Sequence, residues 1–131
     1  MRIIAAVLAT LLVAATPDWT IGLDMPGWRP LSRTADVAAW WRDAPQPVNA
    51  SFARLMVRME RRVPVQGFLS QSVLFEINCS AGNLRALRRI AYRRHRLEGP
   101  ATAVAGPMGW SAPSGAGVEA EIYRQACGGV N

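Results

Sequence analysis

The chain has 131 residues, half of them apolar, and a net charge of +6 that comes from 15 arginines, no lysine and nine carboxylates. This length allows one domain, and the apolar fraction is sufficient for a hydrophobic core. Two cysteines and one histidine argue against a metal site, because such a site needs several ligands at suitable spacing.

The first 15 residues have the pattern of a secretory signal peptide. Arg2 precedes an apolar run from Ile3 to Ala15, and the small residues at its end suit cleavage after Ala15. The run is shorter than the ~20 residues of a transmembrane helix, although a retained membrane anchor is the alternative. We therefore expect a signal peptide over residues 1–15 and one domain over residues 16–131. It would be exported to the periplasm or cell surface of a Gram-negative bacterium.

The next part of the chain predicts short extended segments separated by turns. Thr16 to Leu23 predicts a first strand, and further extended pieces follow at 28–31 and 37–42. In the last of these, Trp40 and Trp41 would point to opposite faces of a sheet, so that one is core and the other partly exposed. Residues 43–47, which include two prolines, predict a loop.

Residues 52–63 alternate between two kinds of side chain. One parity is apolar and the other is mostly polar, including Arg54, Arg58 and Glu60. This pattern is typical of an antiparallel strand with one face in solvent, although a helix is the alternative. The segment from Ser70 to Asn78 is the clearest strand, with Val73, Phe75 and Ile77 on one face.

Residues 84–97 fit two structures. Helical spacing of apolar residues and the helix propensity of arginine narrowly favour a helix. A strand is the alternative, because Gly82-Asn83 directly after the previous strand resembles a hairpin turn.

The C-terminal region predicts a helix that Ser114 caps and that ends near Cys127. Val118, Ile122 and Ala126 would form its apolar stripe, and two glycines follow as the stop signal. In an exported protein, Cys79 and Cys127 most simply form a disulfide, which would tie this helix to the strand that ends at Cys79.

No arrangement in the sequence points to catalysis or to a cofactor. His95, the only histidine, lies in Arg-Arg-His-Arg rather than beside a carboxylate, and Glu60 with Glu76 is the only candidate acid pair, which arginine partners explain more simply. The one candidate interaction patch is an arginine cluster with two tryptophans: Arg85, Arg88, Arg89, Arg93, Arg94, Arg96, Trp40 and Trp41. The alternative is a solvated strand or helix face whose arginines pair with Glu60, Glu76 and Glu98.

The order of these features resembles the surface-adhesin protein E-like family of small exported bacterial domains. The resemblance rests on a tryptophan-led first strand, Asp43, the Ser-to-Cys79 strand, Tyr92, Trp110, Pro113-Ser114 and Cys127. It implies an α+β fold: an antiparallel sheet of about six strands with a C-terminal helix on one face, tethered by the Cys79–Cys127 disulfide. It also implies that residues 84–97 form a strand. The activity that the resemblance implies is adhesion to host extracellular-matrix proteins, with dimerisation.

We therefore expect a non-enzymatic exported domain that binds a macromolecule and has no cofactor, no metal and no nucleic-acid partner. The expected partner is an extracellular or envelope protein, with a homodimer as a further expectation. The alternative is an envelope-accessory domain whose arginine-rich face contacts anionic glycolipid.

Overall fold

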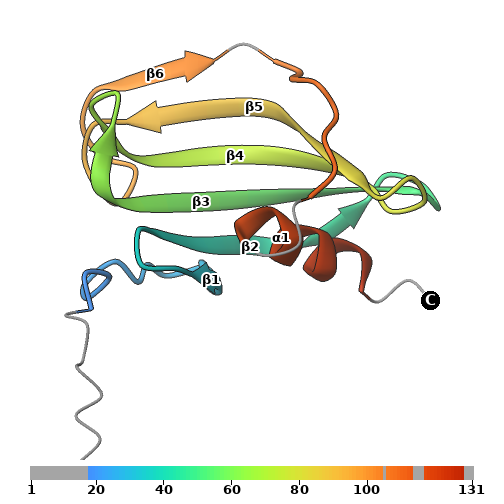
Figure 1. The fold of residues 1–131 in the computed structure, drawn as a ribbon, viewed down its shortest axis with the longest axis horizontal. Helices are drawn as coiled ribbons and strands as arrows, with labels where there is room; N and C mark the ends of the chain where they lie inside the picture. Colours follow the sequence, from blue (N-terminus) through green and yellow to red (C-terminus); the bar gives the residue numbers. More distant parts are fainter. Residues whose placement is uncertain (1–17, 105, 114–116, 129–131) are drawn as a thin grey trace, which may run out of the picture.

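The computed structural model describes residues 18–104, 106–113 and 117–128 of the chain. These residues form six strands and one helix: β1 (Arg29–Arg33), β2 (Val37–Pro47), β3 (Phe52–Val65), β4 (Phe68–Asn78), β5 (Asn83–Tyr92), β6 (Ala101–Val104) and α1 (Val118–Cys127). Each strand pairs antiparallel with the next, so the order of strands in the sheet follows the chain (Figure 1). The six-stranded antiparallel sheet and the C-terminal helix are confirmed.

The expected signal peptide and the capping residue Ser114 lie outside the described residues. Within the described ranges, no helix has both the length and the apolar character needed to cross a bilayer. The helix begins at Val118, later than the sequence suggested, and Gly117 precedes it without a side-chain cap.

The central hairpin is formed by β3 and β4, whose register follows from a tight turn. Val65 pairs with Phe68, and Gln66 and Gly67 between them have φ angles of 53° and 82°. Positive φ at both central residues is the geometry of the two-residue hairpin turns that match strand twist. Gln66 adopts it although a side chain disfavours this region, whereas Gly67 meets no such restriction.

The helix packs on one face of the sheet, which we call the helix face. Ile122 is fully buried there against the alternate residues of the central strands, including Leu55, Val57 and Phe75. The disulfide between Cys79 and Cys127 joins the end of β4 to the end of α1, as predicted. The Tyr123 hydroxyl also donates a hydrogen bond to the Cys79 carbonyl, at 3.0 Å.

Residues 83–92 form a strand, so the helix that local propensity favoured is wrong there. The strand that the family resemblance implied over residues 84–97 is found as far as Tyr92, and residues 93–97 form a loop instead. The strand pairs with β4 on one side and with β6 on the other. Two ladders of hydrogen bonds and the burial of Leu84 and Ala86 outweigh a helix preference that is worth only a few tenths of a kcal/mol per residue.

Two further expectations in the N-terminal half are wrong. Residues 18–23 form turns rather than a strand, because their hydrogen bonds are local, such as that from the Ile21 N–H to the Asp18 carbonyl at 3.1 Å. Residues 43–47 belong to β2 instead of a loop. The strand accommodates them through an irregularity between Arg42 and Gln46, where Asp43 has φ 60°.

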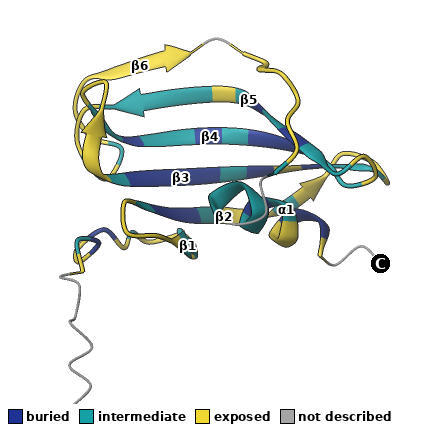
Figure 2. Ribbon diagram, viewed as in Figure 1, coloured by how far each residue is buried: buried dark blue, intermediate teal, exposed yellow. Residues whose placement is uncertain are grey.

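The two faces of the sheet are covered at opposite ends. We call the end that carries Cys79 the disulfide end and the end with the 66–67 turn the turn end. The helix covers the helix face toward the disulfide end. Residues 18–28 and the loop at 93–98 cover the other face, the outer face, toward the turn end. Figure 2 shows the buried residues concentrated in β2, β3 and β4, while β6 is exposed along its length. Each face therefore keeps one open half.

Candidate functional site

The predicted arginine patch does not form one surface. Arg85 and Arg88 lie on the outer face, opposite Glu76 and Leu74 of β4, whereas Arg89 pairs with Val73 and faces the helix side. The remaining three arginines, Arg93, Arg94 and Arg96, follow β5 in the loop at the turn end.

The two predicted tryptophans also separate. Trp40 is buried on the outer face, and its indole N–H donates to the Asp24 carboxylate at 3.1 Å. Trp41 is half-buried on the helix face, where it packs against the core and the Arg29 guanidinium lies 5.3 Å from its ring centroid. Opposite orientations were predicted and are seen, and Trp40 is the core member.

The open half of the outer face carries four arginines in two cross-strand rows. One row runs from Arg42 on β2 through Met56 and Leu74 to Arg88 on β5. The second row consists of Arg54, Glu76 and Arg85 on β3, β4 and β5. We call this group of four arginines with Met56 and Leu74 the arginine surface.

Glu76 organises the second row because its carboxylate lies between two guanidinium groups. Oε1 accepts from Nη2 of Arg85 at 2.8 Å, and Oε2 accepts from Nη2 of Arg54 at 3.3 Å. The Arg54 side chain is 47% exposed and that of Glu76 only 9%. The buried carboxylate thus fixes the forks of two partly exposed arginines.

Tryptophan rings flank the arginine surface on two sides. The Arg85 guanidinium lies 4.5 Å from the ring centroid of Trp110, which itself contacts Phe52 in an edge arrangement. On the other side, the Arg42 guanidinium lies 5.0 Å from the Trp28 ring. Cation–π contacts of this kind restrict guanidinium groups that would otherwise be mobile.

Sequence reasoning missed Arg42, Arg54 and Trp110 as members of this surface. Arg54 and Met56 had the polar parity of β3, which was the available signal. Their proximity to Arg85 and Arg88 depends on which residues of β3, β4 and β5 pair across the sheet. The amino-acid sequence alone does not give this register.

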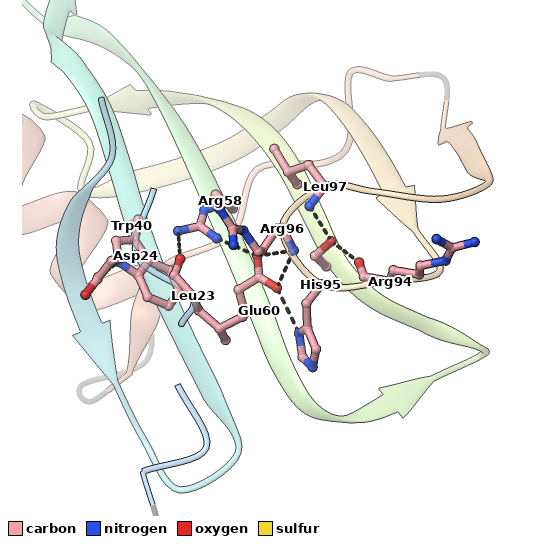
Figure 3. Close-up of polar contacts among 10 residues, drawn as sticks. Leu23, Asp24, Trp40, Arg58, Glu60, Arg94, His95, Arg96 and Leu97 are labelled. Carbon is pink, nitrogen blue, oxygen red and sulfur yellow. Dashed lines mark hydrogen bonds and ion pairs between the residues drawn. The ribbon is translucent and has the colours of Figure 1, made fainter. Parts of the chain in front are cut away.

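The covered half of the outer face holds a buried ion pair, so the expectation that this side of β3 is solvated is wrong there. Arg58 and Glu60 are both fully buried and contact each other at 2.7 Å. Arg58 also donates to the Leu23 carbonyl at 2.7 Å and lies 4.2 Å from the Trp40 ring centroid (Figure 3). Burial lowers the pKa of Arg58, while the charge of Glu60 acts in the opposite direction.

Glu60 receives hydrogen bonds from the loop that closes over it. Nδ1 of His95 lies 2.9 Å from Oε1, and the Arg96 backbone N–H lies 3.1 Å from both carboxylate oxygens. Figure 3 shows these contacts converging on one carboxylate. The histidine is therefore oriented by a carboxylate, which the sequence did not suggest.

This histidine does not form a nucleophilic arrangement with a neighbouring serine. The Ser70 hydroxyl donates to the Arg94 carbonyl at 2.6 Å and accepts from the Leu97 N–H at 3.0 Å, so both of its bonds hold the loop. Glu60 and Glu76 are also six cross-strand pairs apart along β3 and β4 and bind separate arginines. In the described ranges, no cluster of His, Cys, Asp or Glu is arranged to hold a metal ion.

Comparison with known proteins returned no matching family model, curated protein or solved structure. The resemblance to the surface-adhesin protein E-like family therefore stays a prediction.

Proposed function

We propose that this protein is a non-enzymatic, exported binding domain that uses the arginine surface to bind an acidic patch of another protein. The observation that carries the proposal is the placement of four arginines around Met56 and Leu74 on an open half of the sheet. Arginine, methionine and tryptophan are enriched at protein interfaces, and guanidinium forks pair with carboxylates in a defined geometry.

The arrangement favours a protein over a lipid surface. Arg54 and Arg85 are held by Glu76, and the tryptophans restrict Arg42 and Arg85, so their directions are set before binding. Preorganised groups lower the entropy cost of a specific contact, whereas attraction to anionic lipid needs only charge. Adhesion to a matrix protein, as the family resemblance implies, is one form of this activity.

Export is part of the proposal. Disulfides persist in oxidising compartments, and the Cys79–Cys127 bond has a structural position here. N-terminal sequencing of the protein from the periplasmic or surface fraction tests this, with a mature start at Thr16 expected. Protein that stays in the cytosol with its first residues intact would contradict export.

The binding proposal is tested by charge reversal at Arg88 and at Arg94. Both arginines belong to the patch predicted from the sequence, but they lie on different parts of the structure. Extracellular and envelope proteins are screened against the immobilised domain, and the affinity of any purified partner is then measured for Arg88→Glu and for Arg94→Glu. Arg88 belongs to the arginine surface, and Arg94 is an exposed arginine of the loop at the turn end. We expect Arg88→Glu to weaken binding by about tenfold or more and Arg94→Glu to have little effect.

Equal loss in the two variants would contradict the assignment to the arginine surface. The glycolipid alternative is tested by measuring how the domain binds to vesicles that contain anionic lipopolysaccharide. Vesicle binding that falls steeply with moderate salt, without any protein partner, would replace the proposal. Sedimentation of the same variants would show whether the acidic partner is a second copy of the chain.

A further inference from the structure

The open half of the helix face contains a groove with a volume of about 540 Å³. It lies at the turn end of the sheet, beyond the start of α1, whose main contacts are with β1 to β4 (Figure 1). The apolar residues that line it come from the sheet and the first turn of the helix, and they include Val37, Met59, Phe68, Phe75, Val104 and Val118. The volume is within the range of ~300–1,000 Å³ that is typical of small-molecule sites.

Two arginines line this apolar groove without acidic partners. Arg61 on β3 and Arg89 on β5 both border it, and neither has a carboxylate oxygen within 4.0 Å among the described residues. Nε of Arg89 is buried and has no hydrogen-bond partner in the described part of the chain. A buried unpaired N–H group costs free energy, so an acceptor that reached Arg89 would be favoured.

The first turn of α1 adds a second source of positive potential and one opposing charge. Gly117 and Val118 line the groove, so the positive end of the helix dipole lies at it. Glu119 is the one carboxylate among the lining residues, so two cations and a helix terminus outweigh it.

We propose that this groove binds a fatty carboxylate, with its chain on the apolar floor and its headgroup at Arg89. The apolar lining accounts for the chain, because burial of each methylene group is favourable by about 0.8 kcal/mol. The unpaired guanidinium group of Arg89 accounts for the headgroup, since arginine pairs with a carboxylate through two parallel hydrogen bonds. The charge of Arg61 adds positive potential to the same groove. This site is on the face opposite the arginine surface and does not depend on the proposed protein partner.

The experiment compares dodecanoate with dodecanol by calorimetric titration of the full chain, with dodecanoate below its critical micelle concentration and dodecanol below its solubility limit. We expect Arg89→Gln to weaken dodecanoate binding by about tenfold and to leave dodecanol binding unchanged. Arg88→Gln is the matched control, because it removes the same charge one residue away on the outer face. Its affinity for dodecanoate should equal that of the wild type.

A second variant tests whether a more positive groove binds dodecanoate more tightly. Glu119→Gln removes the opposing charge and should tighten dodecanoate binding by roughly twofold to fivefold, a gain that damage to the fold would not produce. Absence of dodecanoate binding to the wild type would overturn the proposal. Equal losses in Arg88→Gln and Arg89→Gln, or a weaker complex in Glu119→Gln, would overturn it as well.

Discussion

Arg58 and Glu60 lie two residues apart on β3, and their side chains form an ion pair of 2.7 Å from which solvent is excluded. Adjacent positions of the same parity place both charges on one face of the strand, and residues 18–28 and the 93–98 loop cover them. The pair therefore connects the N-terminal segment, the sheet and the loop after β5.

Glu60→Gln should lower the free energy of unfolding by about 3 kcal/mol, because it leaves the Arg58 charge buried without a counter-ion. Urea denaturation followed by circular dichroism measures this change. Glu98→Gln, on the exposed part of the loop, is the control and should change stability by less than about 0.5 kcal/mol. Equal stability of the Glu60→Gln variant and the wild type would show that the charge pair is not what holds the covering segments.

Cys79→Ser should destabilise the protein by about 4 kcal/mol, the chain-entropy value for a loop with a sequence separation of 48 residues. Thermal melts of the variant and of the reduced wild type should both shift down by a similar amount. A melting temperature that reduction leaves unchanged would show that the helix packs equally well without its covalent link.

Asp18 should make stability fall at acidic pH. Hydrogen bonds from the Thr20 hydroxyl and N–H, and the nearby Arg33, lower the pKa of Asp18 below its ordinary value. Because the pKa of Asp18 is depressed in the folded state, its ionised carboxylate stabilises the fold fully at pH values above the ordinary pKa. This stabilisation is lost as the pH falls through the pKa of the folded state. A carboxyl titration followed by NMR should give the low pKa. In Asp18→Asn this part of the acid-induced loss should disappear.

Trp110→Ala should weaken partner binding much more than it weakens the fold. Trp110 is 38% exposed and supports the Arg85 guanidinium from one side, an interaction worth about 0.5–1 kcal/mol at an exposed site. Met108→Ala is the matched control, since Met108 is similarly exposed in the same segment. Parallel denaturation and affinity measurements on both variants separate the two effects. Similar affinities in the two variants would remove Trp110 from the binding surface.

The features that followed from the sequence were those set by local pattern. The alternation of Val73, Phe75 and Ile77 predicted β4 on a buried face, and the two cysteines predicted the disulfide. The helix at 118–127 followed from its apolar stripe, although its start was placed too early. In each case the side chains that decide the structure are close in sequence or unique in type.

The features that did not follow depend on distant segments. Polar residues on β3 suggested a solvated face. That face is buried at Arg58 and Glu60, where residues 18–28 lie on it. The sequence of β3 alone does not indicate that another segment covers it. For β5, local propensity favoured a helix, and pairing with two neighbours decided otherwise. The side-chain period of two in a strand then divided the arginine cluster, placing Arg88 and Arg89 on opposite faces.

The link between β4 and the terminal helix also determines what a cut in the chain would do. Residues 106–112 are exposed and lie between the two cysteines, so an endoprotease that reached them would divide the polypeptide into one piece with Cys79 and one with Cys127. The sulfur bridge would hold both pieces together, and the nicked molecule would migrate as a single band until a reducing agent was added. Cleavage at this site would therefore not release the helix from the sheet.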